Sequence, residues 1–299
     1  MMLNERHILS QLLPGLAATE SVAVGPGDDC AALRTSGGGP LLLAAVDQVI
    51  AGVHFLSEGT APERAGAKLM KRNLSDIAAM GGTPRWALLA FAARGCSESW
   101  VLEFCRGAAD AGMRYGTPLT GGDIAGLERD GVAASLTILG EVEESEIVLR
   151  RGAKPGDLLY VTGWIGNSFL SEHHLDFTPR LAEGRFLASH RFASAMLDIS
   201  DGLLLDASRL AAASQVALTV EQERIPLRAG AVPESAWSDG EDYELLFTVP
   251  ADAAAQLEAE WPPGFAPLTR IGSVSAGSGE VLDPEGNSLT EHRKSGYEH

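Results

Sequence analysis

The chain has 299 residues, of which 45% are hydrophobic and 21% are charged. This composition is typical of one large globular domain or two ordinary ones, and it excludes an intrinsically disordered chain. The formal net charge of −17 disfavours nucleic acid or an anionic membrane as a partner, because both would be repelled at long range. We expect neither partner, and we expect metal cations if so acidic a protein handles phosphates.

The first residues and the cysteines indicate a cytoplasmic protein. Residues 1–13 mix charged and apolar side chains and lack the apolar core of a signal peptide, so we predict an amphipathic helix that stops near Pro14. No apolar run is long enough for a membrane span. Cys30, Cys96 and Cys105 form no CxxC pair, which favours reduced, partly buried thiols.

The first half of the chain alternates strands and helices. The expected elements are a strand at 41–47, a helix at 62–80, a strand at 85–93, a helix from 98 to about 115 and a strand at 132–142. Pro62 suits the first turn of the first helix, and Ser97 is a plausible N-cap of the second. Gly37 to Pro40 looks like a hairpin connection. This order predicts an α+β layer with both helices on one face of a sheet.

The second half opens with a turn-rich segment and again mixes helices with strands. The expected elements are a strand at 158–162, a helix at 202–213, strands at 216–220 and 243–249, a helix at 251–260 and a closing pair of strands at 268–274 and 280–282. We place the boundary between residues 147 and 148, which gives an N-terminal domain at 1–147 and a C-terminal domain at 148–299.

Aspartates recur beside glycine or serine, or at the ends of predicted elements. They lie in the stretches 25–29, 46–47, 73–76, 121–123, 198–202 and 238–242. Each stretch alone is explained by a turn or a helix cap. Together they indicate Mg²⁺, which takes oxygen ligands and completes its shell with phosphates, whereas unpaired carboxylates would repel one another. We therefore predict a phosphoryl-transfer site built from aspartates on several loops.

Two of these stretches predict a local geometry. Asn73 and Asp76 are three residues apart and should share a helix face. The helix after Asp201 should point free backbone N–H groups at an anion, with Gly202 permitting close approach.

Other signatures of nucleotide or metal sites are absent from the sequence. There is no GxxxxGK[ST] loop, no kinase-type glycine loop with HRD and DFG, no complete GxGxxG after a strand, and no zinc-ligand spacing. We interpret His173 and His174 as a solvated pair without a metal.

Eight stretches resemble the thiamine-monophosphate kinase family in order and spacing, over nearly the whole chain. They are GPGDDCAAL (25–33), DQVIAGVHF (47–55), NLSDIAAMGGTPRWALLA (73–90), GGD (121–123), RRGAKPGDLLYVTG (150–163), DISDGLLLD (198–206), SDGEDYELLFT (238–248) and GY (296–297). NLSDIAAMGG and GEDYELLF are specific to this branch of the aminoimidazole-ribonucleotide-synthetase-like superfamily.

The resemblance implies a two-domain α+β fold, in which the N-terminal domain dimerises through its sheet and the C-terminal domain is α/β. It implies transfer of the γ-phosphoryl group of ATP to thiamine monophosphate, with several Mg²⁺ ions. By motif matching, the Mg²⁺ ligands would be Asp28, Asp29, the carbonyl of Val46, Asp47, Asp76, Asp123, Asp198 and Asp201. ATP would contact Tyr115, Gly122, Asp123, Arg150 and Ser200, and thiamine phosphate would contact His54, Glu241 and Tyr297.

This chemistry needs no general base. The nucleophile is a phosphate oxygen with a second pKa of about 6, already largely deprotonated at neutral pH. Mg²⁺ and Arg150 would offset the repulsion between two anionic phosphates and align them in line. Two residues have alternative explanations: His54 could cap a strand, and Arg150 could pair with Glu146 on the surface.

The sequence departs from the family pattern at several positions. Ala45 and Val46 replace Ser-Thr, which leaves only backbone carbonyls as ligands there, and Ile124, Asn167 and Asp239 replace Thr, Asp and Gly. These changes keep open a non-catalytic nucleotide-binding paralogue.

Another enzyme of the superfamily is the second alternative. Selenophosphate synthetase would carry a reactive Cys near its start, but no Cys precedes Cys30. The hydrogenase-maturation dehydratase would end in Cys, whereas this sequence ends Gly-Tyr-Glu-His. Aminoimidazole ribonucleotide synthetase lacks NLSDIAAMGG in this form.

Overall fold

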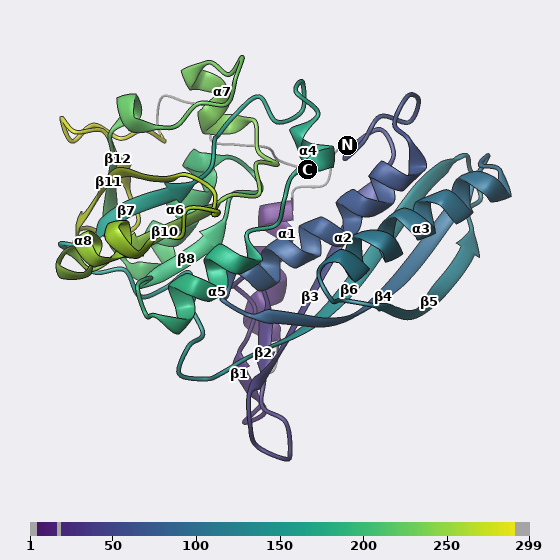
Figure 1. Cartoon of the computed structure of the whole chain (residues 1–299), viewed down its shortest axis with the longest axis horizontal. Helices are drawn as coiled ribbons and strands as arrows, with labels where there is room; N and C mark the ends of the chain where they lie inside the picture. Colours follow the sequence, from purple (N-terminus) through teal and green to yellow (C-terminus); the bar gives the residue numbers. More distant parts are fainter. Residues whose placement is uncertain (1–4, 17–18, 291–299) are drawn as a thin grey trace.

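The computed structural model describes residues 5–16 and 19–290, and two six-stranded sheets form its frame. Figure 1 shows the first sheet on the right, crossed by α2 (Pro62–Ala79) and α3 (Glu98–Arg114), and the second sheet on the left. The predicted boundary at 147/148 lies in the connection between β6 (Gly131–Val142) and β7 (Leu158–Thr162), and it stays a prediction.

The first sheet has the strand order β1-β2-β3-β6-β4-β5. Its strands are β1 (Val22–Val24), β2 (Ala31–Leu33), β3 (Leu41–Ile50), β4 (Thr83–Arg94), β5 (Leu119–Gly126) and β6 (Gly131–Val142). Neighbours are antiparallel except β4 and β5, which are parallel. The three predicted strands are confirmed as β3, β4 and β6, and Gly37 to Pro40 does connect an antiparallel pair. The short strands β1, β2 and β5 were not predicted.

The helices of this half are α1 (Glu5–Leu12), which continues as a 3-10 turn at Leu13–Gly15, α2 (Pro62–Ala79) and α3 (Glu98–Arg114). Pro62 occupies the first turn of α2, and Ser97 Oγ accepts the Trp100 N–H at the start of α3, as predicted. Both helices lie on one face of the sheet (Figure 1). Most side chains of α2 that face the sheet and α3 are buried, which explains why the helix is stable there.

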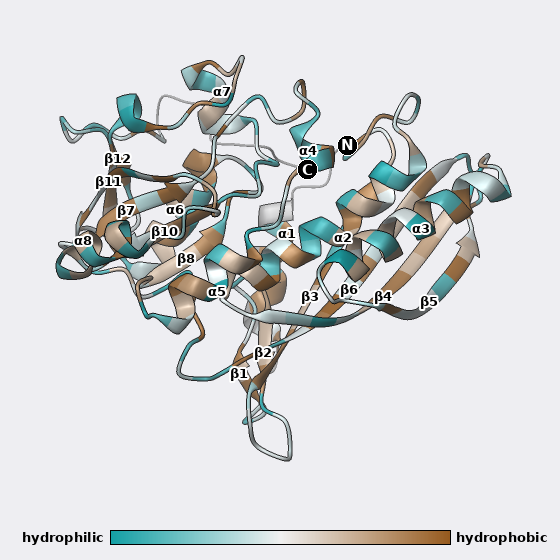
Figure 2. Cartoon of the chain, viewed as in Figure 1, coloured by the Kyte–Doolittle hydropathy of each residue, from teal (hydrophilic) through white to brown (hydrophobic). Residues whose placement is uncertain are grey.

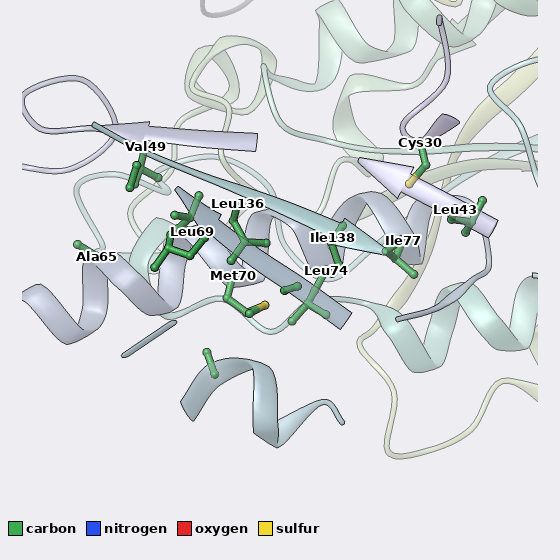
Figure 3. Close-up of a cluster of buried hydrophobic side chains, with 14 of the residues drawn as sticks. Cys30, Leu43, Val49, Ala65, Leu69, Met70, Leu74, Ile77, Leu136 and Ile138 are labelled. Atoms are coloured by element: carbon green, nitrogen blue, oxygen red, sulfur yellow. The ribbon is translucent and has the colours of Figure 1, made fainter. Parts of the chain in front are cut away.

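Glycines set the distance between α2 and α3. A Cβ atom on Gly66 would lie 1.9 Å from the Phe104 carbonyl oxygen, and one on Gly107 would lie 2.1 Å from the Glu63 carbonyl oxygen. Only glycine permits so close an approach. Beneath them, a buried cluster joins α2 to β3 and β6, and Figure 3 labels among its members Leu43, Leu69, Met70, Leu74, Ile77, Leu136 and Ile138.

The opposite face of the first sheet is open. Val46 of β3 is 65% exposed, and Trp86 and Leu88 of β4 are 43% and 44% exposed. Strand β6 alternates between buried and half-buried residues along its whole length. This alternation is the pattern of a sheet that is covered by helices on one side only.

The second sheet has the order β12-β9-β11-β7-β10-β8. Its strands are β7 (Leu158–Thr162), β8 (Ala195–Asp198), β9 (Val216–Val220), β10 (Leu245–Val249), β11 (Leu268–Ala276) and β12 (Val281–Leu282). Strands β9 and β12 pair in parallel, and the other neighbours are antiparallel. The predicted closing pair was wrong in its pairing, because β12 lies against β9 and not against β11.

Helices cover both faces of the second sheet. They are α4 (His173–Asp176), α5 (Leu181–Ser189), α6 (Leu203–Ser214), α7 (Pro233–Ser238) and α8 (Ala251–Glu260), with a 3-10 turn at Gln222–Arg224. Successive residues of β10 enter two different cores: Leu246 packs with α6, and Phe247 packs with α5 and α8. Burial on both sides explains why β8 and β10 are mostly apolar and buried at every residue, and why brown predominates in these strands in Figure 2.

No helix within residues 5–16 and 19–290 combines the length and the apolar character needed to cross a membrane. Cys96 and Cys105 are half-buried, as predicted, whereas Cys30 is buried more fully than expected.

Candidate active site

Three aspartates bring their carboxylates together from distant parts of the chain. Asp29 lies between β1 and β2, Asp76 lies on α2, and Asp198 ends β8; one carboxylate oxygen of each lies within 4.8 Å of the others. Burial and the neighbouring carboxylates raise the pKa of Asp76 and of Asp198 well above the usual value. An all-oxygen set with excess negative charge fits a hard divalent cation such as Mg²⁺.

Arg150 closes one side of this cluster. Its Nη2 lies 2.5 Å from Asp29 Oδ1, its Nε lies 3.3 Å from Asp29 Oδ2, and its backbone N–H donates to Asp28 Oδ1 at 2.7 Å. The alternative pairing with Glu146 was wrong, because Glu146 pairs with Arg185 at 2.7 Å. The guanidinium therefore lies beside the carboxylates, where it can also meet an anion.

Asp47 lies inside β3, where Arg72 of α2 holds it. The guanidinium donates to both carboxylate oxygens, from Nε at 3.0 Å and from Nη2 at 3.1 Å. Asn73 Oδ1 accepts the Asp47 backbone N–H at 3.1 Å. The charge of Asp47 contributes to the raised pKa of Asp76, so Asp47 lies at the border of the carboxylate cluster.

The loop after β8 is held by Asp206. The backbone N–H groups of Ser200 and Asp201 both donate to Asp206 Oδ2, at 3.0 and 2.9 Å. The expected anion contact of the N–H groups at the start of α6 stays a prediction. Arg209 lies 2.6 Å from Asp201 Oδ2 and 2.7 Å from Asp206 Oδ1. The predicted ligand Asp201 is thus ion-paired, and burial raises the pKa of Asp206 to about 6.

A pocket of about 220 Å³ lies beside the cluster and gathers several predicted site residues. Its lining is Val53, His54, Arg72, Phe169, Ser200, Asp201, Asp239, Gly240, Glu241 and Tyr243. His54 also caps a strand, since its Nδ1 accepts the Ile50 N–H at 3.0 Å. The strand-capping interpretation of His54 is therefore confirmed, and its contact with the substrate stays a prediction.

The buried side chain of Lys68 forms an ion pair with Glu241. Lys68 Nζ lies 2.7 Å from Glu241 Oε1 and 2.8 Å from His174 Nδ1. Burial would raise the pKa of Glu241, but hydrogen bonds from His174 and Lys68 lower it to about 2. His174 is 3% exposed, so the interpretation of His173 and His174 as a solvated pair was wrong.

The segment that departs from the family at Asn167 supports the loop that carries Glu241. The Gly166 N–H donates to both oxygens of Asp242, the Asn167 N–H donates to Asp239, and Ser168 Oγ donates to the Glu241 carbonyl. Asp239 and Asp242 therefore have structural roles, while Glu241 faces the pocket.

Two predicted site residues lie elsewhere. Gly122 and Asp123 are on the edge strand β5, not in a turn, and three inter-strand steps separate β5 from β3, a distance of about 14 Å. Asp123 pairs with Ala90 and shares its open face, whereas Asp47 aligns through Leu136 with residues on the helix face. The chain alone therefore does not bring Asp123 to the cluster.

Tyr115 directly follows α3 and lines a separate pocket with Lys71, Arg114 and Asp176. None of the three clustered aspartates lines that pocket. Tyr297 lies outside the described residues.

The motifs missed Lys68, Arg72 and Tyr243. A usable signal was present, because Lys68, Arg72 and Asp76 follow one another at intervals of four residues and therefore share one face of α2. Tyr243 gave no such signal, since a tyrosine beside a strand is ordinary.

Comparison with known proteins places the chain in a class and then in a family. Residues 27–142 match the family model described as AIR synthase related protein, N-terminal domain, so this part of the chain is an N-terminal domain of the AIR synthase-related class. A thiamine-monophosphate kinase of Rhodopirellula baltica is 37% identical, over 92% of this chain and 90% of the relative.

Solved structures of thiamine-monophosphate kinases are also similar to this chain. A structure of AaThiL complexed with AMPPCP and TMP has a TM-score of 0.83 at 31% identity, covering 100% of this chain and 99% of that one. The thiamine monophosphate kinase from Aquifex aeolicus has a TM-score of 0.76 at 30% identity, covering 95% and 96%. The chain belongs to the thiamine-monophosphate kinase family and is an enzyme of the kinase class, and the predicted two-domain α+β fold is confirmed.

Proposed function

We propose that this chain phosphorylates thiamine monophosphate to thiamine diphosphate with ATP, by direct in-line transfer of the γ-phosphoryl group. The observation that carries the proposal is the convergence of Asp29, Asp76 and Asp198 from three distant segments. The pocket beside them contains His54 and Glu241, which the family motifs assign to the substrate. Family membership and the neighbour with AMPPCP and TMP support the same reaction.

The metal is proposed to be Mg²⁺, held first by the three clustered carboxylates. The further ligands predicted from the motifs are Asp28, Asp47, Asp201 and the Val46 carbonyl. In this structure Asp47 is ion-paired with Arg72, and Asp201 is ion-paired with Arg209. A metal ion would have to displace the arginine from each carboxylate that it binds. When bound, Mg²⁺ would neutralise charge on the phosphates.

The protein groups position and neutralise the reactants without acting as a base. The attacking phosphate oxygen is already largely deprotonated at neutral pH, since its second pKa is about 6. Arg150 would stabilise negative charge at the phosphates from its position beside Asp29. Glu241, held ionised by Lys68 and His174, would supply a negative charge for the cationic thiazolium ring of the acceptor.

A homodimer would explain the position of Asp123. The open face of the first sheet exposes Val46, Trp86 and Leu88, and an apolar face of this kind is suited to a second copy of the chain. Asp123 points from the same face. We propose that two copies meet through these faces and that Gly122 and Asp123 contribute to the site of the partner.

We also place the activity in the cytoplasm. The cysteines are free thiols, and thiols persist in reducing compartments.

The test is an assay with purified protein, ATP, Mg²⁺ and thiamine monophosphate, analysed by chromatography. Thiamine diphosphate and ADP are expected in equal amounts, and the Asp76→Ala variant should form neither while it stays folded. Absence of product at saturating Mg²⁺ would refute the kinase reaction. Binding of ATP without turnover would instead indicate a non-catalytic nucleotide-binding protein.

A further inference from the structure

One buried polar atom beside the pocket, the Tyr243 hydroxyl oxygen, has no hydrogen-bond partner within residues 5–16 and 19–290. Tyr243 is 2% exposed and lines the pocket, and its hydroxyl forms no hydrogen bond with any of the described residues. A buried hydroxyl without a partner is rare in proteins and costs stability. The Tyr243 hydroxyl therefore either forms a hydrogen bond with a ligand in the pocket or lowers the stability of the fold without a compensating contact.

The backbone around this tyrosine is also in an uncommon conformation. Glu241 and Tyr243 have φ values of 55° and 51°, in the left-handed region that side chains other than glycine seldom adopt. The Glu241 N–H donates to the Ser200 carbonyl at 2.7 Å, and the Tyr243 N–H donates to the Ile199 carbonyl at 2.8 Å. The fold thus maintains the strain, as is common where side chains must be aimed at a ligand.

Packing fixes the direction of the ring. Phe177 stacks on Tyr243 with ring centroids 4.1 Å apart and an interplanar angle of 19°. Leu245, two residues on, is already in β10 and buried. The hydroxyl therefore has little freedom to seek another partner within the chain.

The surroundings of the hydroxyl identify the kind of ligand. Burial raises the pKa of Tyr243 well above the usual value, so the hydroxyl keeps its proton at neutral pH and acts as a hydrogen-bond donor. Arg72 lies in the same pocket lining, and its guanidinium is paired with Asp47 in this structure. Exchange of Asp47 to the proposed metal ion would leave the positive charge of Arg72 to an anionic ligand. A donor beside a guanidinium is complementary to an anionic oxygen.

We propose that the Tyr243 hydroxyl donates a hydrogen bond to a phosphate oxygen of the phosphoryl acceptor, with Arg72 as the neighbouring positive charge. This inference rests on the proposed function for the identity of the acceptor as thiamine monophosphate. It assigns Tyr243 to substrate binding and gives the unpaired hydroxyl a partner only in the complex.

The Tyr243→Phe variant tests this, because it removes one oxygen and keeps the ring. Without ligand, the variant should melt at the same temperature as the wild type or up to about 4 °C higher, since an unsatisfied buried hydroxyl is lost. Its affinity for thiamine monophosphate, measured by calorimetry, should fall roughly 10- to 100-fold, as expected for a hydrogen bond to a charged group. Its KM should rise with a smaller change in kcat.

Tyr160→Phe is the matched control. Tyr160 is also buried, but its hydroxyl donates to Glu258 Oε1 at 2.7 Å, away from the pocket. This variant should lose thermal stability and keep its affinity for the acceptor. Tyr243→Phe should therefore lose affinity and keep its stability, whereas Tyr160→Phe should lose stability and keep its affinity.

Two results would overturn the inference: unchanged affinity in Tyr243→Phe, which would mean that the hydroxyl binds only water, or a clear loss of ligand-free stability. Inorganic phosphate, titrated into both proteins, separates this inference from the proposed function. If the wild type binds phosphate more tightly than the variant does but fails to bind thiamine monophosphate, the hydrogen bond stands and the assigned acceptor is wrong. If the wild type binds neither ligand, both are wrong.

Discussion

Replacing Asp76 with Asn should make the metal-free protein more stable. Asp76 lies on α2 and is one of the three clustered aspartates. One of its carboxylate oxygens lies within 4.8 Å of carboxylate oxygens of Asp29 and Asp198. The raised pKa of Asp76 means that ionisation costs folding free energy. Asparagine keeps the shape of the side chain and removes that charge.

The size of the effect follows from the geometry. Two unit charges at this separation repel by at least about 3 kcal/mol at an effective dielectric constant of about 20. Asp76 faces two such partners, and Arg150 offsets the charge of Asp29. Partial protonation of the aspartates relieves part of the remaining repulsion. We therefore expect Asp76→Asn to raise the unfolding free energy by about 1–3 kcal/mol, or the Tm by about 2–10 °C.

The assay is thermal unfolding with a chelator at pH 5 and pH 8. A carboxyl whose folded-state pKa is raised contributes stability below its unfolded pKa and loses it as the pH rises through the folded value. The advantage of the variant should therefore be larger at pH 8. Added Mg²⁺ should raise the Tm of the wild type by mass action and leave the variant nearly unchanged.

Asp130→Asn serves as the control, because the Asp130 side chain is 84% exposed and its replacement should change little. The reasoning fails if Asp76→Asn is less stable than the wild type without metal, or if both respond equally to Mg²⁺. Either result would mean that the three carboxylates do not form one metal-binding cluster.

Further expectations concern the buried ion pair, the loop after β8 and the open sheet. Lys68→Met should lower the unfolding free energy in urea by about 1.5–3 kcal/mol, because it removes a charged hydrogen bond to the half-buried Glu241. Adding Glu241→Gln should restore part of the loss, and no recovery in the double variant would contradict the pairing. Burial raises the pKa of Asp206 to about 6, so the unfolding free energy of the wild type relative to Asp206→Asn should fall between pH 4 and pH 6 and then level off. A difference independent of pH would refute this. Leu88→Glu should yield monomers in sedimentation, whereas the exposed Leu102→Glu on α3 should not; dimers in both would exclude the open face as the interface.

The sequence predicted the elements whose ends carry chemical signals. Helix α2 begins at Pro62, and α3 begins after the cap Ser97, because both residues act through local geometry. Strand β5 was missed because Leu119–Gly126 is rich in glycine and has little strand propensity; it is a strand because its backbone bonds to the edge of β4. The pairing of β12 with β9 likewise depends on tertiary packing.

The candidate site was predictable where residue type alone indicates the chemistry. The Asp29, Asp76 and Asp198 carboxylates were expected to meet, and they do. Asp47 and Asp76 lie in β3 and α2, within the strand and the helix predicted there, whereas the expected loop at Asp123 was wrong, because Asp123 lies within β5. Lys68 was missed because its partner Glu241 is 173 residues away, and no local pattern reports such a contact.

Helix α2 connects the pocket to the carboxylate cluster. Lys68 pairs with Glu241 at the pocket, and Asp76 belongs to the cluster; eight residues of helix separate them, or about 12 Å. An α-helix hardly stretches, so α2 fixes this spacing along its axis. One residue inserted between them would turn one group by about 100° relative to the other. Under the proposed function, the number of residues in this part of α2 would therefore set how far the acceptor's support lies from the metal site.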